Sequence, residues 1–153
     1  MFTRRSTRPE TSYPVARSDQ EWRELLPADR YDVLRRAGTE APWSGDLLQV
    51  DGEGVFSCAG CGAELFDTGA KFESGTGWPS FDRARSAGSV EERRDRSLFM
   101  ARTEILCARC GGHLGHVFPD GPTDTGQRYC VNSLSLTYEP TGDPGGQPRP
   151  AGP

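Results

Sequence analysis

The sequence is poor in lysine, histidine and long apolar runs. Lys71 is the one lysine among 18 basic residues, the chain has 2 histidines, and its net charge is −4. Because binding to nucleic acid needs a concentrated basic surface, we expect no nucleic-acid partner. Because no apolar run is long enough to be a membrane span or the centre of an export signal, we expect no membrane partner and a cytoplasmic location.

Apolar residues are scarce as well. Only 34% of the 153 residues are hydrophobic, whereas Gly (19) and Pro (12) are abundant. This composition favours short strands and loops over a helical bundle, and its thin core would gain from a bound metal. We expect one monomeric domain over residues 19–139. A disordered N-terminal arm (1–18) and a disordered Pro/Gly-rich tail (140–153) flank it.

Helical spacing of apolar residues is confined to residues 19–36. It predicts two short helices, the first capped by Ser18 or Asp19, the second starting with Pro27 as its first helical residue and ending at Gly38. Beyond them, short apolar runs between glycines predict a mainly β fold. The expected strands are 55–56, 65–66, 71–72, 97–105, 114–118 and 129–138. The charged stretch 90–96 is interpreted as a solvated face or loop.

Four of the 5 cysteines form two copies of a C-x-x-C-G motif, at 58–62 and 107–111. Two intervening residues let one tight turn direct both sulfurs at a metal, and the trailing glycine suits a positive φ. Cys58, Cys61, Cys107 and Cys110 would together give the closed Cys₄ shell of one structural Zn²⁺. Two redox-active pairs, or thiols that merely pack, are the alternatives, and the two trailing glycines favour zinc.

Cys130 stands outside these motifs. If its segment is extended, Arg128, Cys130 and Asn132 share one face, where the arginine would favour a reactive thiolate. A buried structural cysteine is the alternative. His113 and His116 are the histidines that thiol catalysis would require, although sequence order alone does not bring them to Cys130. Surface positions are one alternative. A role as replacement zinc ligands is another, which four cysteines make less favourable.

Trp78 lies in Gly75–Phe81, where flanking glycines and Pro79 indicate an exposed and rigidly held indole. Simple packing of this indole in the core is the alternative.

Taken together, these motifs resemble the methionine-R-sulfoxide reductase B family. The matching stretches are 38–45, 71–81, 113–122 and 128–133, and the two C-x-x-C-G motifs fall where zinc-bearing members have them. The resemblance covers about residues 19–139. It implies two antiparallel β-sheets with short N-terminal helices, and thiol-dependent reduction of the R epimer of methionine sulfoxide, in oxidised proteins and peptides or as the free amino acid.

The resemblance also implies roles for individual residues. Cys130 would be the nucleophile and become a sulfenic acid. Residues that stabilise its thiolate, orient the sulfoxide and assist proton transfer would be Arg128, His113, His116 and Asn132. Trp78 and Phe118 would seat the substrate's methyl group.

Family members often carry a second, resolving cysteine where Thr76 stands here. We therefore expect a one-cysteine cycle, completed by thioredoxin or another thiol reductant. Two other functions compete with this reading. A binding module without catalysis would have lost Cys130 or its polar neighbours, and a zinc-ribbon nucleic-acid binder would need a basic face.

Overall fold

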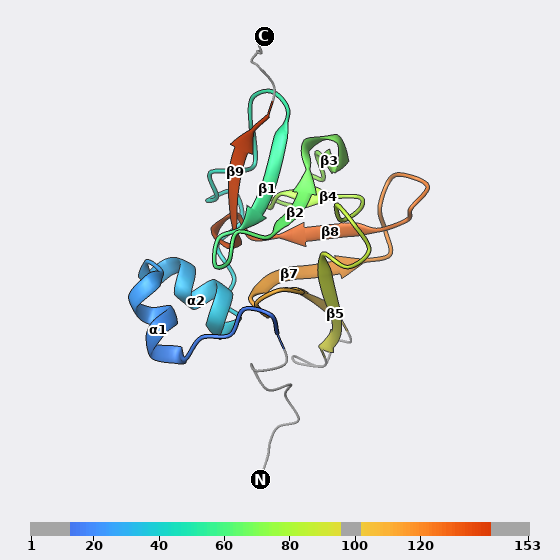
Figure 1. Ribbon diagram of the computed structural model, residues 1–153. Helices are drawn as coiled ribbons and strands as arrows, with labels where there is room; N and C mark the ends of the chain where they lie inside the picture. The colour runs from blue at the N-terminus through green and yellow to red at the C-terminus, as the bar shows by residue number, and fades with distance from the viewer. Residues whose placement is uncertain (1–12, 96–101, 142–153) are drawn as a thin grey trace.

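The computed structural model describes residues 13–95 and 102–141 (Figure 1). Helix α1 (Asp19–Leu25) begins at Ser18, whose hydroxyl accepts from the Glu21 amide while the Glu21 carboxylate accepts from the Ser18 amide. This reciprocal capping satisfies amides that have no partner within the helix. Helix α2 (Ala28–Arg36) differs from expectation at both ends. Pro27 is the N-cap, one residue before the helix, and Ala37 rather than Gly38 adopts the left-handed conformation at its end (φ 58°).

Two antiparallel sheets confirm the mainly β fold. The smaller has the order β2-β1-β9 and the larger the order β3-β4-β8-β7-β6-β5. The strands of the smaller sheet are β1 (Gly54–Cys58), β2 (Glu64–Asp67) and β9 (Leu136–Pro140). Those of the larger sheet are β3 (Lys71–Phe72), β4 (Ser80–Phe81), β5 (Val90–Asp95), β6 (Arg102–Cys107), β7 (His113–Phe118) and β8 (Arg128–Val131).

Three strand expectations need correction. The charged stretch from residue 90 forms β5, which pairs with β6 at the edge of the sheet, where charged side chains are normal. Strand β4 (Ser80–Phe81) was not expected, because its two residues directly follow the Gly/Pro-containing segment around Trp78. The expected strand 129–138 is broken by a 3₁₀ turn, Ser133–Ser135, whose first two amides donate to the buried Glu40 carboxylate. Residues 97–101 of another expected strand lie outside the described residues.

Aromatic side chains join the two sheets. Phe66 of the smaller sheet stacks on Phe81 of the larger one with ring centroids 4.3 Å apart, and Phe56 meets Phe81 edge-on at 5.0 Å. Helix α2 packs against β7 and the 3₁₀ turn, so the helices cover one end of the strands (Figure 1). No helix in the described part of the chain is long and apolar enough to cross a membrane.

The ends of the domain extend beyond the expected limits. Tyr13 is 7% exposed and donates a hydrogen bond to Glu91 (2.7 Å), and the Val15 amide bonds to the Arg109 carbonyl. The segment 13–18 is therefore anchored to the domain at Tyr13 and Val15, whereas its other residues are exposed. At the other end the Thr141 amide bonds to Glu53. The expected disorder of 1–12 and 142–153 lies outside the described residues.

Candidate active site and metal centre

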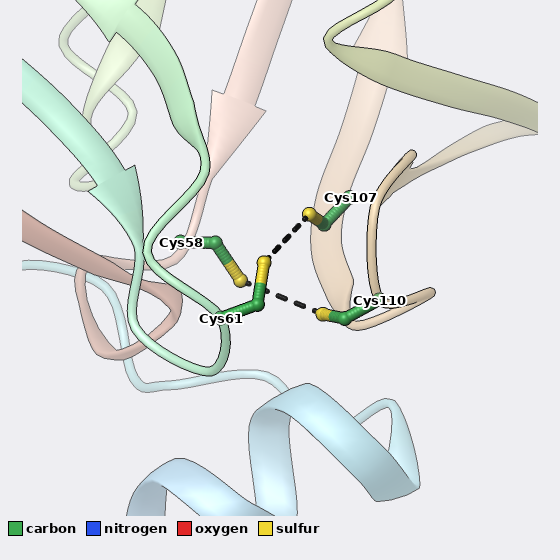
Figure 2. Close-up of side chains that lie close together, drawn as sticks. All are labelled: Cys58, Cys61, Cys107 and Cys110. Carbon is green, nitrogen blue, oxygen red and sulfur yellow. Dashed lines mark hydrogen bonds between the residues drawn. The ribbon is translucent and has the colours of Figure 1, made fainter. Parts of the chain in front are cut away.

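The four cysteines of the two C-x-x-C-G motifs converge, as the sequence predicts. Figure 2 shows their sulfurs pointing toward one another from two separate turns. All four sulfurs lie within 4.8 Å of one another, with Cys58 and Cys110 at 3.7 Å and Cys61 and Cys107 at 3.6 Å. A tetrahedron with Zn–S bonds of ~2.3 Å has edges of about 3.8 Å. The cluster therefore has the size needed to bind a metal ion.

The two turns share one backbone design. The Gly62 amide donates to the Cys58 carbonyl, and the Gly111 amide donates to the Cys107 carbonyl, both at 2.8 Å. Gly62 and Gly111 have φ values of 83° and 77°, a region that favours glycine. One turn follows β1 and the other follows β6, so a metal held here would link the smaller sheet to the larger one.

The thiols of this cluster do not ionise independently. Hydrogen bonds with neighbouring thiols, that with Cys107 foremost, raise the pKa of Cys58 and Cys110 and lower the pKa of Cys61. The bond with Cys110 lowers the pKa of Cys107. Closely packed thiolates repel one another, so all four would ionise together only around a cation. This chemistry also fits a metal site.

Away from this cluster, a cavity of about 290 Å³ opens beside Cys130. It gathers most of the residues predicted for the reactive site, and others that the sequence reasoning did not assign to it. The predicted residues along its wall are Cys130, Arg128, His116, Asn132, Trp78, Phe118 and Thr76. Thr39, Arg102, Gly115 and Val131 complete the wall.

Strand β8 holds Cys130 between two other strands. Its register partners are Ser80 on β4 and His116 on β7. Behind it, a Cβ atom at Gly115 would lie 1.9 Å from the Cys130 carbonyl oxygen, so only glycine allows β7 this close. The thiol itself is half-buried. Cys130 is thus a free thiol on a rigid strand with one side open to the cavity.

Burial raises the pKa of the Cys130 thiol above its ordinary value. The positive charge of Arg128 and a hydrogen bond with Thr76 act in the opposite direction, and the charge of Glu40 adds to the rise. The charge of Arg128 therefore favours the thiolate, but the effect of burial on the pKa of Cys130 is larger than the effect of this charge.

Asp120 fixes the position of Arg128, although no role was expected for it from the sequence. The guanidinium donates two hydrogen bonds to the Asp120 carboxylate, at 2.9 and 3.1 Å, and lies over the Phe118 ring at 4.4 Å. These bonds lower the pKa of Asp120 and raise that of Arg128. The bidentate pair keeps one cation beside Cys130.

His113 does not line the cavity but lies behind His116. It is only 4% exposed, and the two imidazole rings meet edge-to-face with centroids 5.6 Å apart. A regular strand would place residues three apart on opposite faces. Here Leu106 pairs with His113 and Ile105 with Gly115, so Leu114 is an extra residue that disturbs the alternation. Sequence periodicity alone could not reveal this shift.

Trp78 and Asn132 are held by Glu40, another residue that sequence reasoning missed. The half-exposed indole donates to the Glu40 carbonyl at 3.1 Å, and the Glu40 amide donates to the Asn132 side chain at 3.1 Å. The Asn132 amide group in turn donates to Leu114, so its polar atoms support the wall of the cavity. Glu40 is only 7% exposed, and in the structure such burial of a charged side chain indicates an important role. The sequence alone does not show that this residue is buried.

Comparisons of the sequence with a family model and with curated proteins show one family. The SelR domain model matches residues 26–140. The chain is 56% identical over 129 residues to the peptide methionine sulfoxide reductase MsrB of Leifsonia xyli subsp. xyli, covering 84% of this chain and 93% of that protein. It is 53% identical over 125 residues to the protein of the same name from Methanosarcina barkeri, with coverages of 82% and 88%. The crystal structure of the Mis18 Yippee-like domain aligns at a TM-score of 0.48 and 23% identity, covering 59% of this chain and 98% of that one.

Proposed function

The chain belongs to the SelR domain family and is a peptide methionine sulfoxide reductase, and we propose that it reduces the R epimer through Cys130. The observation that carries this proposal is the half-buried thiol of Cys130 in a cavity with the His116 imidazole and the Trp78 indole. These groups supply the nucleophile, a proton donor and an apolar surface. Methionine sulfoxide needs all three, since its sulfur is weakly electrophilic, its oxygen must be protonated and its methyl group is apolar.

In the proposed first step the Cys130 thiolate attacks the sulfoxide sulfur and forms an S–S bond, while one proton passes to the sulfoxide oxygen. The hydroxyl group then moves to the Cys130 sulfur as the S–O and S–S bonds of the substrate sulfur break, so that methionine leaves and Cys130 becomes a sulfenic acid. His116, with His113 behind it, would deliver this proton, and Asn132 would help to orient the oxygen. Arg128 would stabilise the thiolate. Trp78 and Phe118 would hold the methyl group, so that a fixed donor and a fixed apolar wall select one epimer.

The cycle would then need an external thiol. One thiol reduces the sulfenic acid by forming a mixed disulfide and releasing water, and a second thiol releases Cys130. Thr76 stands at the cavity wall where relatives often carry a resolving cysteine, and the other four cysteines are grouped at the metal centre. Thioredoxin or a small thiol in the cytoplasm would serve as reductant for a monomeric enzyme that repairs oxidised proteins.

We also propose that the metal is a single structural Zn²⁺ bound by Cys58, Cys61, Cys107 and Cys110. Four sulfur ligands suit Zn²⁺ and leave no coordination position for substrate. Its contribution would be to stabilise the fold.

Turnover of peptides that carry either epimer tests the proposed reaction. With dithiothreitol as reductant, we expect methionine to form from the R epimer and not from the S epimer, measured by chromatography of the product peptide. Reduction of both epimers at similar rates would contradict the proposed stereochemistry. Reduction of neither by folded, metal-loaded protein would support a binding module instead.

The one-cysteine cycle predicts that protein oxidised by substrate contains no intramolecular disulfide. Mass spectrometry of the wild type after reaction should show one added oxygen. Because the Thr76 side chain reaches Cys130, the Thr76→Cys variant should instead lose the mass of two hydrogen atoms as a bridge forms. A bridge from Cys130 to any cysteine in the wild type would overturn the cycle.

The raised pKa of Cys130 predicts how the reactivity of its thiol depends on pH. Alkylation by iodoacetamide needs the thiolate, so its rate should rise with pH through a midpoint above the ordinary thiol value of about 8.5. The Arg128→Gln variant removes a charge that lowers this pKa and should move the midpoint higher. Arg94→Gln, at an exposed position on β5, is the matched control and should leave the midpoint unchanged. A wild-type midpoint below the ordinary value would contradict this account.

A further inference from the structure

We propose that Glu104 is a positioning residue that holds His113 in one tautomer and, through His113, keeps His116 at the cavity wall. The proposal rests on the proposed function, because it concerns the histidines of the same site. Glu104 does not line the cavity, so it would affect the reaction only through the histidines beside it.

The contact that supports this role is short and shielded from water. Nδ1 of His113 lies 2.7 Å from a carboxylate oxygen of Glu104, and the two side chains are 5% and 18% exposed. Glu104 on β6 is also the register partner of His116 on β7, so this residue lies beside both histidines while its carboxylate contacts His113. Hydrogen bonds to an ionised group in such surroundings are stronger than neutral ones and leave little freedom to the ring.

The chemistry of the pair fixes the tautomer. An ionised carboxylate can only accept a hydrogen bond, so Nδ1 of His113 must carry the hydrogen. In the neutral imidazole, Nε2 then has a free lone pair and can accept a proton. The carboxylate also stabilises His113 when the ring becomes positively charged.

Because His113 packs against His116, a fixed His113 ring also restricts the orientation of a ring at the cavity wall. The His113 ring packs edge-to-face on His116 with an interplanar angle of 71°, and His116 in turn faces Phe118 with centroids 6.4 Å apart. Glu104 therefore contacts His113, His113 contacts His116, and His116 lines the substrate cavity. Donors speed a reaction most when they are oriented before the substrate arrives, and these contacts would provide that orientation.

Two substitutions separate positioning from simple structural support. In Glu104→Gln the amide oxygen can still accept from Nδ1, whereas Glu104→Ala removes the acceptor. Glu92→Ala, an exposed glutamate on the neighbouring strand β5, is the matched control. Nitrogen NMR of the histidine rings reports the tautomer without substrate. Because the chain has 2 histidines, the spectrum of the His116→Gln variant shows the signals of His113 alone and so assigns the signals of both rings.

We expect wild-type His113 to be protonated at Nδ1, and Glu104→Gln to keep this tautomer. In Glu104→Ala the tautomer should be lost, and kcat for the R epimer should fall roughly 10- to 100-fold. KM should change little, because no group that contacts substrate is removed. Glu104→Gln should retain most of kcat, and the control should match the wild type.

Three results would overturn the proposal. They are a wild-type His113 protonated at Nε2, a folded Glu104→Ala variant with wild-type kcat, and a Glu104→Gln variant that keeps the tautomer but loses kcat as fully as Glu104→Ala. The tautomer of His113 is measured on the wild type, so this test holds even if a variant fails to fold. Absence of reductase activity in the wild type would instead refute the proposed function, and the ring spectra would still report the tautomer.

Discussion

Replacing Cys130 with serine is expected to lower kcat/KM for the R epimer by roughly 10³-fold or more. The hydroxyl of serine is a far weaker nucleophile toward sulfur than a thiolate and cannot form a sulfenic acid. Thiol and hydroxyl are similar in size, and the side chain borders a cavity, so the packing of β8 should persist. The measurement is steady-state turnover of an R-sulfoxide peptide with dithiothreitol, wild type against Cys130→Ser.

The control for this variant is its metal content and melting temperature, both of which should equal those of the wild type. Retention of even a tenth of the activity by such a folded variant would show that Cys130 is not the nucleophile. One of the four clustered cysteines would then have to take that role.

Loss of the proposed Zn²⁺ is expected to have the largest effect on stability. Structural zinc sites contribute apparent binding free energies of about 10–16 kcal/mol in small zinc domains, more than the whole stability of most domains. The site here links the turn after β1 to the turn after β6, in two different sheets. Chelation, or the Cys58→Ser substitution, should therefore abolish cooperative unfolding or lower Tm by more than about 10 °C.

Calorimetry and metal analysis of the same samples would test this prediction. Ser57→Ala is the matched control, since Ser57 adjoins Cys58 on β1 but lies outside the cluster, and it should change Tm by only a few degrees. A metal-free chain that keeps the wild-type melting temperature would contradict a structural role for the metal.

Local sequence patterns predicted the two cysteine-bearing turns and the shared face of the Cys130 segment, whereas the other residues expected at the cavity were assigned through the family resemblance. The repeated C-x-x-C-G motif defines two turns whose glycines adopt the expected positive φ. Arg128, Cys130 and Asn132 line the same cavity, as expected for an extended segment, although Val131 also contributes to its wall. These features follow from a few neighbouring residues.

Features that depend on distant contacts were not predictable in this way. The position of His113 behind His116 follows from an irregularity in the pairing of β6 with β7. The turn at Ser133 depends on a carboxylate contributed by Glu40, far away in the sequence. Strand β5 has no apolar alternation, because its place at the edge of the sheet allows charged side chains.

In the proposed reaction, Cys130 takes the oxygen of the R epimer. The most direct test is a single turnover without reductant, followed by quantification of methionine and by dimedone labelling with peptide mapping. We expect this reaction to yield methionine equimolar with the protein from the R epimer, almost none from the S epimer, and a dimedone adduct on Cys130 alone. Methionine without an adduct on Cys130, or an adduct on a cysteine of the metal cluster, would contradict it.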